Sequence, residues 1–226
     1  LHKKLRNMID FIKQALSEGL LAFRKNLLPA SILWFFGICV LSTYYFIPEL
    51  RWIFDTVENL KNNTGLYFLF FSTGFFGAIL PTLFSTYILK QVPFPFTKTL
   101  VLFLFWGVKG IEVEYFYRFQ HWAFEDNILL KIAFDEFIYV PLWGLASVAL
   151  FYYWVDCDYS FKTFKQELGK NWYRDRIAKV LIPNWSVWIP AVCIIYLLPQ
   201  PLQLPLQNIT LAFWVMILAY LTTKNK

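Results

Sequence analysis

Three charged side chains lie within one long apolar stretch of the sequence. Residues 99–117 read TLVLFLFWGVKGIEVEYFY, and this run carries Lys109, Glu112 and Glu114. A charge at the centre of a lipid bilayer costs about 2.5–3.5 kcal/mol on insertion scales. Three such charges facing lipid would not be stable, so we expect them to face a bundle interior, a water-filled cavity or each other.

Helical spacing pairs these charges with one another. In a helix, Lys109 and Glu112 are three residues apart and share a face, while Glu114 and Arg118 are four apart and share another. Glu112 and Glu114 are two apart and point to nearly opposite sides. We therefore expect two internal ion pairs that face different neighbours.

A second charged group follows in the next apolar segment. Lys131 and Asp135 are four residues apart, and Glu136 is adjacent to Asp135. Two buried adjacent acids do not readily ionise together, and Arg118 is a candidate partner for one of them. We predict a polar seam between the two segments. Its members are Lys109, Glu112, Glu114, Arg118, Lys131, Asp135 and Glu136.

The charged residues admit three interpretations. They are ion pairs that only fix helix packing, or the lining of a path for a small solute, or a carboxyl relay in proton-coupled transport. Catalysis by a carboxylate pair has little support, because the sequence holds no nucleophile motif, phosphate loop or set of metal ligands. We expect no enzymatic activity, no metal site and no cofactor.

The composition of the chain is typical of a membrane protein. Of its 226 residues, 58% are hydrophobic and 16% are charged, whereas a soluble domain carries about 25% charged residues. Aromatic residues make up 21% of the chain, which suits contact with lipid. The net charge of +6 does not indicate nucleic-acid binding, because the basic residues flank apolar segments rather than form one stripe.

Six apolar segments are expected to cross the membrane. They are residues 27–47, 66–89, 99–121, 129–155, 184–198 and 205–223. The fifth is short and either crosses or re-enters, and the Pro-rich run LPQPLQLP separates it from the sixth. Residues 49–65 are expected to form a mixed loop.

Two basic amphipathic segments flank these spans, at residues 1–26 and 156–179. Both are candidates for helices that lie at an anionic membrane surface, although the first is equally well interpreted as a solvated helix packed on the bundle. On this map, 16 Lys and Arg residues fall on the side that holds both termini and 4 on the other. The bias follows the positive-inside rule and supports six spans.

Small residues and tryptophans complete the set of candidate positions. Gly107 and Gly110, three apart in one span, favour close helix packing over a gating hinge. Asn184, Trp185 and Trp188 lie where the second basic segment enters the membrane, and Trp residues at such places are anchors in the interface.

The pattern of these residues resembles that of the Mpv-seventeen and peroxisomal membrane protein (PMP-twenty-two type) family. The matching residues are Gly107, Gly110 and Tyr117-Arg118; Lys131, Asp135-Glu136 and Pro141; and Asn184-Trp185, Trp188 and Pro190. The resemblance covers about residues 66–223. It implies two parts: residues 1–65, with an amphipathic helix and one added span, and residues 66–226, a family-like helical bundle.

This chain departs from the family pattern at several positions. Glu136 stands where the family usually has Gln, Glu114 where many members have His, and Ile189 separates a Trp and a Pro that are usually adjacent. The resemblance therefore implies the fold more strongly than the solute.

Members of the family are integral proteins of the mitochondrial inner membrane, peroxisomes and related membranes, with bacterial relatives, and are thought to form channels or support metabolite homeostasis. We accordingly expect an all-α polytopic bundle in an organelle membrane or a bacterial cytoplasmic membrane, forming or modulating a small-solute channel. The alternative is a non-transporting accessory subunit of a larger membrane complex. The expected partners are the lipid bilayer and other membrane proteins or further copies of the chain, not nucleic acid.

Overall fold

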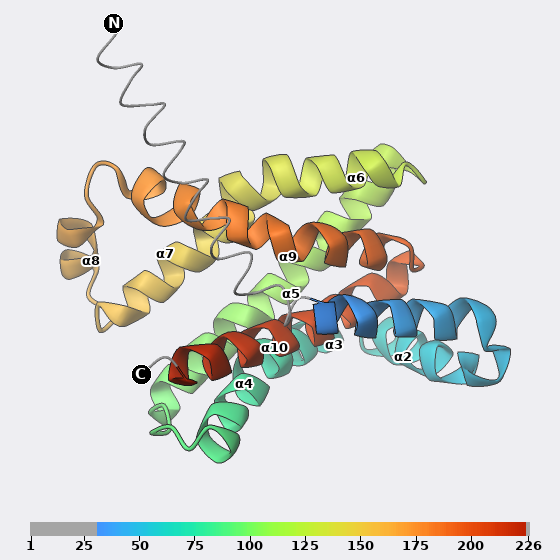
Figure 1. The fold of residues 1–226 in the computed structure, drawn as a ribbon, viewed down its shortest axis with the longest axis horizontal. Coiled ribbons are helices and arrows are strands. Elements are labelled where there is room, and N and C mark those ends of the chain that lie inside the picture. Colours follow the sequence, from blue (N-terminus) through green and yellow to red (C-terminus); the bar gives the residue numbers. More distant parts are fainter. Residues whose placement is uncertain (1–30, 225–226) are drawn as a thin grey trace, which may run out of the picture. The chain divides into compact units, whose positions relative to one another are not determined.

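The computed structural model describes residues 31–224, which form helices joined by turns and short connections, with no strand (Figure 1). The all-α prediction is confirmed for this part of the chain, and the amphipathic helix predicted at residues 1–26 lies outside it. The described chain divides into two compact units. We call residues 31–131 with 191–224 the large unit and residues 132–190 the small unit.

The large unit begins with a helix at Ser31–Phe46, which meets the next helical segment at a bend of 103°. Its later elements are the 3-10 turn η1 (Pro48–Leu50), α2 (Arg51–Thr64), α3 (Leu66–Gly74), the π-helical turn η2 (Phe75–Ile79), α4 (Leu80–Leu83), the π-helical turn η3 (Phe84–Ile88), α5 (Phe96–Phe124) and α10 (Gln200–Lys224). The boundaries between the two units fall within two helices, α6 (Ile128–Phe134) and α9 (Lys179–Tyr196).

The predicted loop at residues 49–65 is wrong, because most of this segment forms α2. Its less exposed positions are Phe54, Val57, Glu58 and Lys61, which recur at helical spacing. The helix ends at Gly65, whose φ of 55° is the left-handed conformation that glycine adopts without strain.

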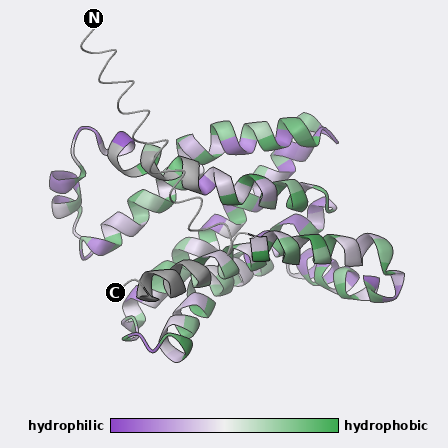
Figure 2. Cartoon of the chain, in the orientation of Figure 1, coloured by the Kyte–Doolittle hydropathy of each residue, from purple (hydrophilic) through white to green (hydrophobic). Residues whose placement is uncertain are grey.

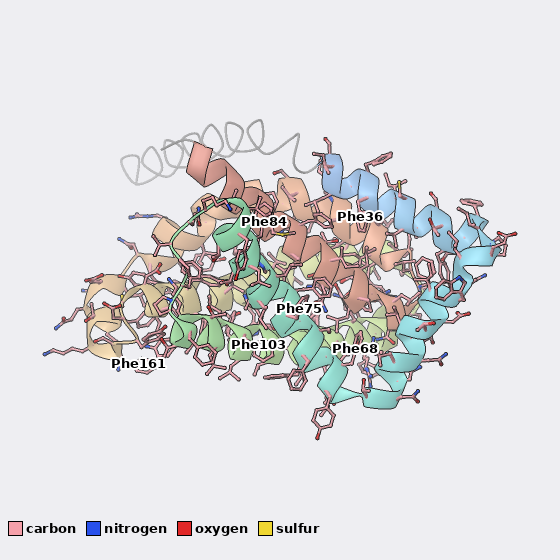
Figure 3. The ribbon with its side chains drawn as sticks, turned by 90° about the horizontal axis from the view of Figure 1, so that it is seen from below. Phe36, Phe68, Phe75, Phe84, Phe103 and Phe161 are labelled. Carbon is pink, nitrogen blue, oxygen red and sulfur yellow. The ribbon has the colours of Figure 1, made fainter. Side chains whose placement is uncertain are left out.

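The centre of the large unit is the contact of α3 and η2 with α5. Figure 3 shows these two segments, in turquoise and green, with Phe75 labelled on one and Phe103 on the other. The ring of Phe103 lies 5.7 Å from that of Phe70, edge to face. The contact is close because glycines on both segments leave room for the neighbouring rings.

The small unit is a helical corner around one apolar cluster. Its elements are the π-helical segment η4 (Asp135–Gly144), α7 (Leu145–Asp156), α8 (Phe161–Leu168), the π-helical turn η5 (Tyr173–Ala178) and the first part of α9. The cluster joins Ala146 of α7 to Ile177 of η5 and Leu181 of α9.

The predicted amphipathic segment at 156–179 is interrupted in the structure. Gly169, with a φ of 70°, ends α8, and η5 follows after a short connection. Ser160 caps the start of α8 by accepting a hydrogen bond from the Thr163 amide at 3.2 Å. Phe161 stacks on Trp154 with 5.3 Å between ring centroids, so part of the apolar face of α8 packs on α7.

Two continuous helical stretches of the described residues are long and apolar enough to cross a membrane, Leu66–Ile88 and Ile128–Asp156. The bent pair Ser31–Phe46 and Pro48–Thr64 makes a third if it counts as one span. Figure 2 shows that hydrophilic residues gather at α8 and the connections, whereas the long helices are mainly apolar. Two or three helices are therefore suited to a membrane.

Candidate functional site

Glu114, near the middle of α5, is the buried centre of an ion-pair network in the large unit, in which the Lys61 side chain is 4% exposed and that of Arg118 is 59% exposed. The Glu114 side chain is 1% exposed. One carboxylate oxygen accepts a hydrogen bond from Lys61 Nζ at 2.6 Å, and the other accepts from Arg118 Nε and Gln200 Nε2, each at 3.0 Å. The carboxylate thus receives two cations and an amide from three helices, and we call these four residues the Glu114 network.

Lys61 is the one buried residue of α2. Its ammonium group also donates to the backbone carbonyl of Pro201, at 2.9 Å. Pro205 lies four residues after Pro201 within α10, and proline has no N–H to give to that carbonyl. Lys61 therefore satisfies a carbonyl that the helix itself leaves open.

A stripe of polar side chains extends the network along α10. Gln200, Gln203, Gln207 and Asn208 recur at helical spacing and face inward, with Gln203 and Asn208 buried. Gln203 donates to the Leu198 carbonyl at 3.0 Å. The other partners of the stripe are Tyr117, which donates to Gln207, and Thr73 and Ser72, which contact Asn208 at 3.0 and 3.2 Å.

The predicted small residues of α5 lie at its contact with α3. A Cβ atom on Gly110 would be 2.2 Å from Thr73 Oγ1 and 2.5 Å from the Leu69 carbonyl oxygen. A Cβ atom on Gly107 would be 2.6 Å from the ring of Phe70. Both glycines therefore allow α3 to approach at a distance that no other residue permits, and Gly110 brings Thr73 to the polar stripe.

Lys109 and Glu112, the other predicted pair of α5, form an ion pair three residues apart. The Lys109 side chain is 7% exposed and that of Glu112 is 27% exposed. Glu112 thus lies toward the surface of the described structure, whereas Glu114, two residues on, is enclosed. The helix separates the two acids as its geometry requires.

The predicted residues of the next segment are also buried. Lys131 lies in α6, and Asp135 and Glu136 lie in η4, each no more than 5% exposed. The carboxyl oxygens of Glu136 have no hydrogen-bond partner among the described residues. The seam that was predicted between these residues and α5 stays a prediction.

Pro141 interrupts the hydrogen bonds of η4, and side chains of the small unit fill the gap. In a π-helix the carbonyl of Glu136 would pair with the amide of residue 141, which proline lacks. Trp185 Nε1 donates to this carbonyl instead, at 2.7 Å, and Tyr173 donates to the Pro141 carbonyl at 3.1 Å. Trp185, predicted as an interface anchor, is thus also a structural hydrogen-bond donor, while Asn184 and Trp188 are half-buried in α9.

The sequence does not identify two residues of the Glu114 network. Lys61 falls in the segment predicted as a loop, and Gln200 falls in the predicted Pro-rich turn, because prolines at 199, 201 and 205 suggest a later start for α10 than the structure has. Two signals were present: the helical spacing of Phe54, Val57 and Lys61, and the polar stripe of α10 within an apolar span.

The chemistry of the network is electrostatic. It consists of a carboxylate, an ammonium, a guanidinium, amides and a backbone carbonyl, and these groups can bind small polar or charged species. Among the side chains that the structure describes, no group of three or more His, Cys, Asp or Glu is placed to hold a metal ion.

Comparison with known proteins returns no match: no family model, no curated protein and no solved structure is significantly similar to this chain. The resemblance noted from the sequence motifs therefore remains a prediction, and function must be argued from the site.

Proposed function

We propose that this chain is a multi-pass integral membrane protein whose Glu114 network and polar stripe serve the passage of a small polar solute. One observation carries the proposal: Glu114 is enclosed in a unit with an apolar surface, yet polar side chains continue from it along α10. Intramembrane ionisable residues of this kind typically mark solute or ion paths.

The proposed topology has six crossings with both termini on the positive face. The apolar stretches Leu66–Ile88 and Ile128–Asp156 support two of them by length and composition. Helix α5 has 29 residues, enough to cross, and its charges at Lys109, Glu112 and Glu114 are paired within the protein. The amphipathic α8, with Lys162 and Lys165 beside an exposed Phe161, suits the interface with anionic lipid.

The resemblance to the Mpv-seventeen and peroxisomal membrane protein family is part of this proposal. It favours an organelle membrane, or the cytoplasmic membrane of a bacterium, and a channel-like role.

The test is solute flux in liposomes that contain the purified protein. Osmotic shrinkage followed by light scattering reports the entry of small neutral and charged solutes. Glu114→Gln removes the central charge of the network and is expected to reduce flux at least about tenfold, the effect of roughly 1.4 kcal/mol on a barrier. Glu125→Gln, at an exposed carboxylate just after α5, is the matched control and should leave flux unchanged.

A second candidate function is that of an accessory subunit in a larger membrane complex. It is favoured by the full pairing of Glu114, whose two oxygens both accept hydrogen bonds, as expected of ion pairs that only join helices. This reading predicts stable co-purification with partner proteins in mild detergent and no flux from the chain alone. Flux from a purified chain that loses it in Glu114→Gln would exclude the accessory role as the sole function.

A further inference from the structure

The buried ammonium group of Lys61 donates hydrogen bonds to two oxygen atoms. It lies 2.6 Å from a carboxylate oxygen of Glu114 and 2.9 Å from the carbonyl oxygen of Pro201. Both acceptors belong to long helices of the large unit, and the carbonyl is open because Pro205 interrupts its helix. Transporters coordinate small cations with backbone carbonyls that a broken helix leaves unpaired, and here such a carbonyl shares the Lys61 ammonium with a carboxylate.

Helix α2, which carries Lys61, exposes most of its side chains. Lys61 is the one buried residue of α2, and Trp52 and Leu60 of the same helix are 63% and 51% exposed. The helix starts after a bend of 103° and ends at Gly65, whose φ is 55°. Helix α2 thus has a turn at each end. Besides the Lys61 ammonium, its contacts include the Phe54 ring, 5.2 Å from that of Tyr44 in the preceding helix, and Arg51, 4.3 Å from the same Tyr44 ring.

Charge balance decides what could replace that ammonium. If Lys61 withdrew alone, the Glu114 carboxylate would stay buried with Arg118 and Gln200 as partners, and its Lys61 contact would be lost. A monovalent cation that enters as the lysine leaves keeps the charge of the network constant. A divalent ion is disfavoured, because it would add one positive charge to a network whose single carboxylate is also paired with Arg118.

We propose that the Glu114 carboxylate and the Pro201 carbonyl form a binding site for a small monovalent cation, either a primary ammonium or an alkali ion. Lys61 is the tethered occupant of this site, and release of α2 exchanges the lysine for the free ion. The inference rests on the proposed function, since it names the class of solute that this network would bind.

The test uses the full chain in detergent, with thermal unfolding followed by tryptophan fluorescence. Methylammonium, potassium and sodium chloride are compared with the bulky N-methyl-D-glucamine chloride at constant ionic strength. Lys61→Ala should show a saturable rise in unfolding temperature with at least one of the three small cations, and Lys61→Ala/Glu114→Gln should show none. A tethered group acts at an effective concentration of roughly millimolar or more, so wild type should need at least about tenfold more cation than the variant.

The three cations distinguish the possible ligands. A response to methylammonium alone assigns an ammonium ligand, and a response to potassium or sodium assigns an alkali ion. If Lys61→Ala fails to fold, Lys61→Met keeps most of the apolar stem and is measured in its place. In wild type, a saturating cation should also increase hydrogen exchange in α2 while α10 stays protected.

The proposal is overturned if neither Lys61 variant distinguishes the small cations from N-methyl-D-glucamine and wild-type α2 does not respond. This result is separable from failure of the proposed function. Cation binding without flux would support the proposed cation site and contradict the proposed solute pathway. Flux without cation-specific binding would support the pathway and contradict the cation site.

Discussion

Lys61 Nζ lies 2.9 Å from the carbonyl oxygen of Pro201, which Pro205 leaves without a helical partner. The small unit holds a comparable arrangement, in which the Trp185 indole donates at 2.7 Å to the carbonyl of Glu136, five residues before Pro141. In both places a proline removes a backbone hydrogen bond from its helix. A side chain from another helical segment then donates to the carbonyl that is left without a partner. Such compensation is how proline is accommodated inside membrane helices.

Replacing Lys61 with Met is expected to destabilise the protein by about 3 kcal/mol, the lower end of the range for a broken buried ion pair, because Arg118 and Gln200 still donate to Glu114. Thermal unfolding in detergent measures this loss. The change Pro205→Ala restores a backbone N–H for the Pro201 carbonyl. In that background the loss from Lys61→Met should be about 1 kcal/mol smaller. Equal losses in the two backgrounds would show that the carbonyl contact has no energetic role.

Gly110→Ala is expected to destabilise the large unit by about 1–3 kcal/mol, since the new Cβ would lie 2.5 Å from the backbone carbonyl of Leu69 and α3 would have to move. Chemical or thermal unfolding in detergent is the measurement. Gly37→Ala is the matched control, because its Cβ would meet only the flexible side chain of Ile194, at 3.2 Å. A variant at Gly110 as stable as the one at Gly37 would contradict the close approach of α3 to α5.

Trp185→Phe is expected to cost about 1–3 kcal/mol, because it leaves the buried carbonyl of Glu136 without a donor. The cost should fall when Pro141 is replaced by Ala, which returns an N–H to the helix. A double-mutant cycle on unfolding free energy measures this coupling. Trp188→Phe, a neighbouring half-buried position, serves as the control and should show no coupling to Pro141.

The proposed topology predicts which side of the membrane each connection faces. Single cysteines at positions 93 and 165, in a variant without Cys39, Cys157 and Cys193, should react with an impermeant maleimide from the side of the termini. Cysteines at 62 and 126 should react from the opposite side, since the apolar stretch Leu66–Ile88 would separate 62 from 93. Labelling of 62 and 93 from one side would instead make this stretch re-entrant.

The all-helical class and the pairing of near neighbours followed from the sequence. A helix brings residues three and four apart to one face whatever surrounds it, so Lys109 with Glu112 and Glu114 with Arg118 were predictable and are both present. The spacing of Gly107 and Gly110 likewise marked a face where another helix could approach closely.

What only the tertiary structure decided is which distant groups complete the network. Lys61 and Gln200 are far from Glu114 in the chain, and their meeting depends on how α2, α5 and α10 pack. From the sequence, Pro201 and Pro205 predict a break between two helices. In the structure, both prolines lie within α10, and the Pro201 carbonyl accepts a hydrogen bond from Lys61. Local periodicity determines the face on which a side chain lies, but packing determines what that face meets, and for this protein the candidate site depends on the second.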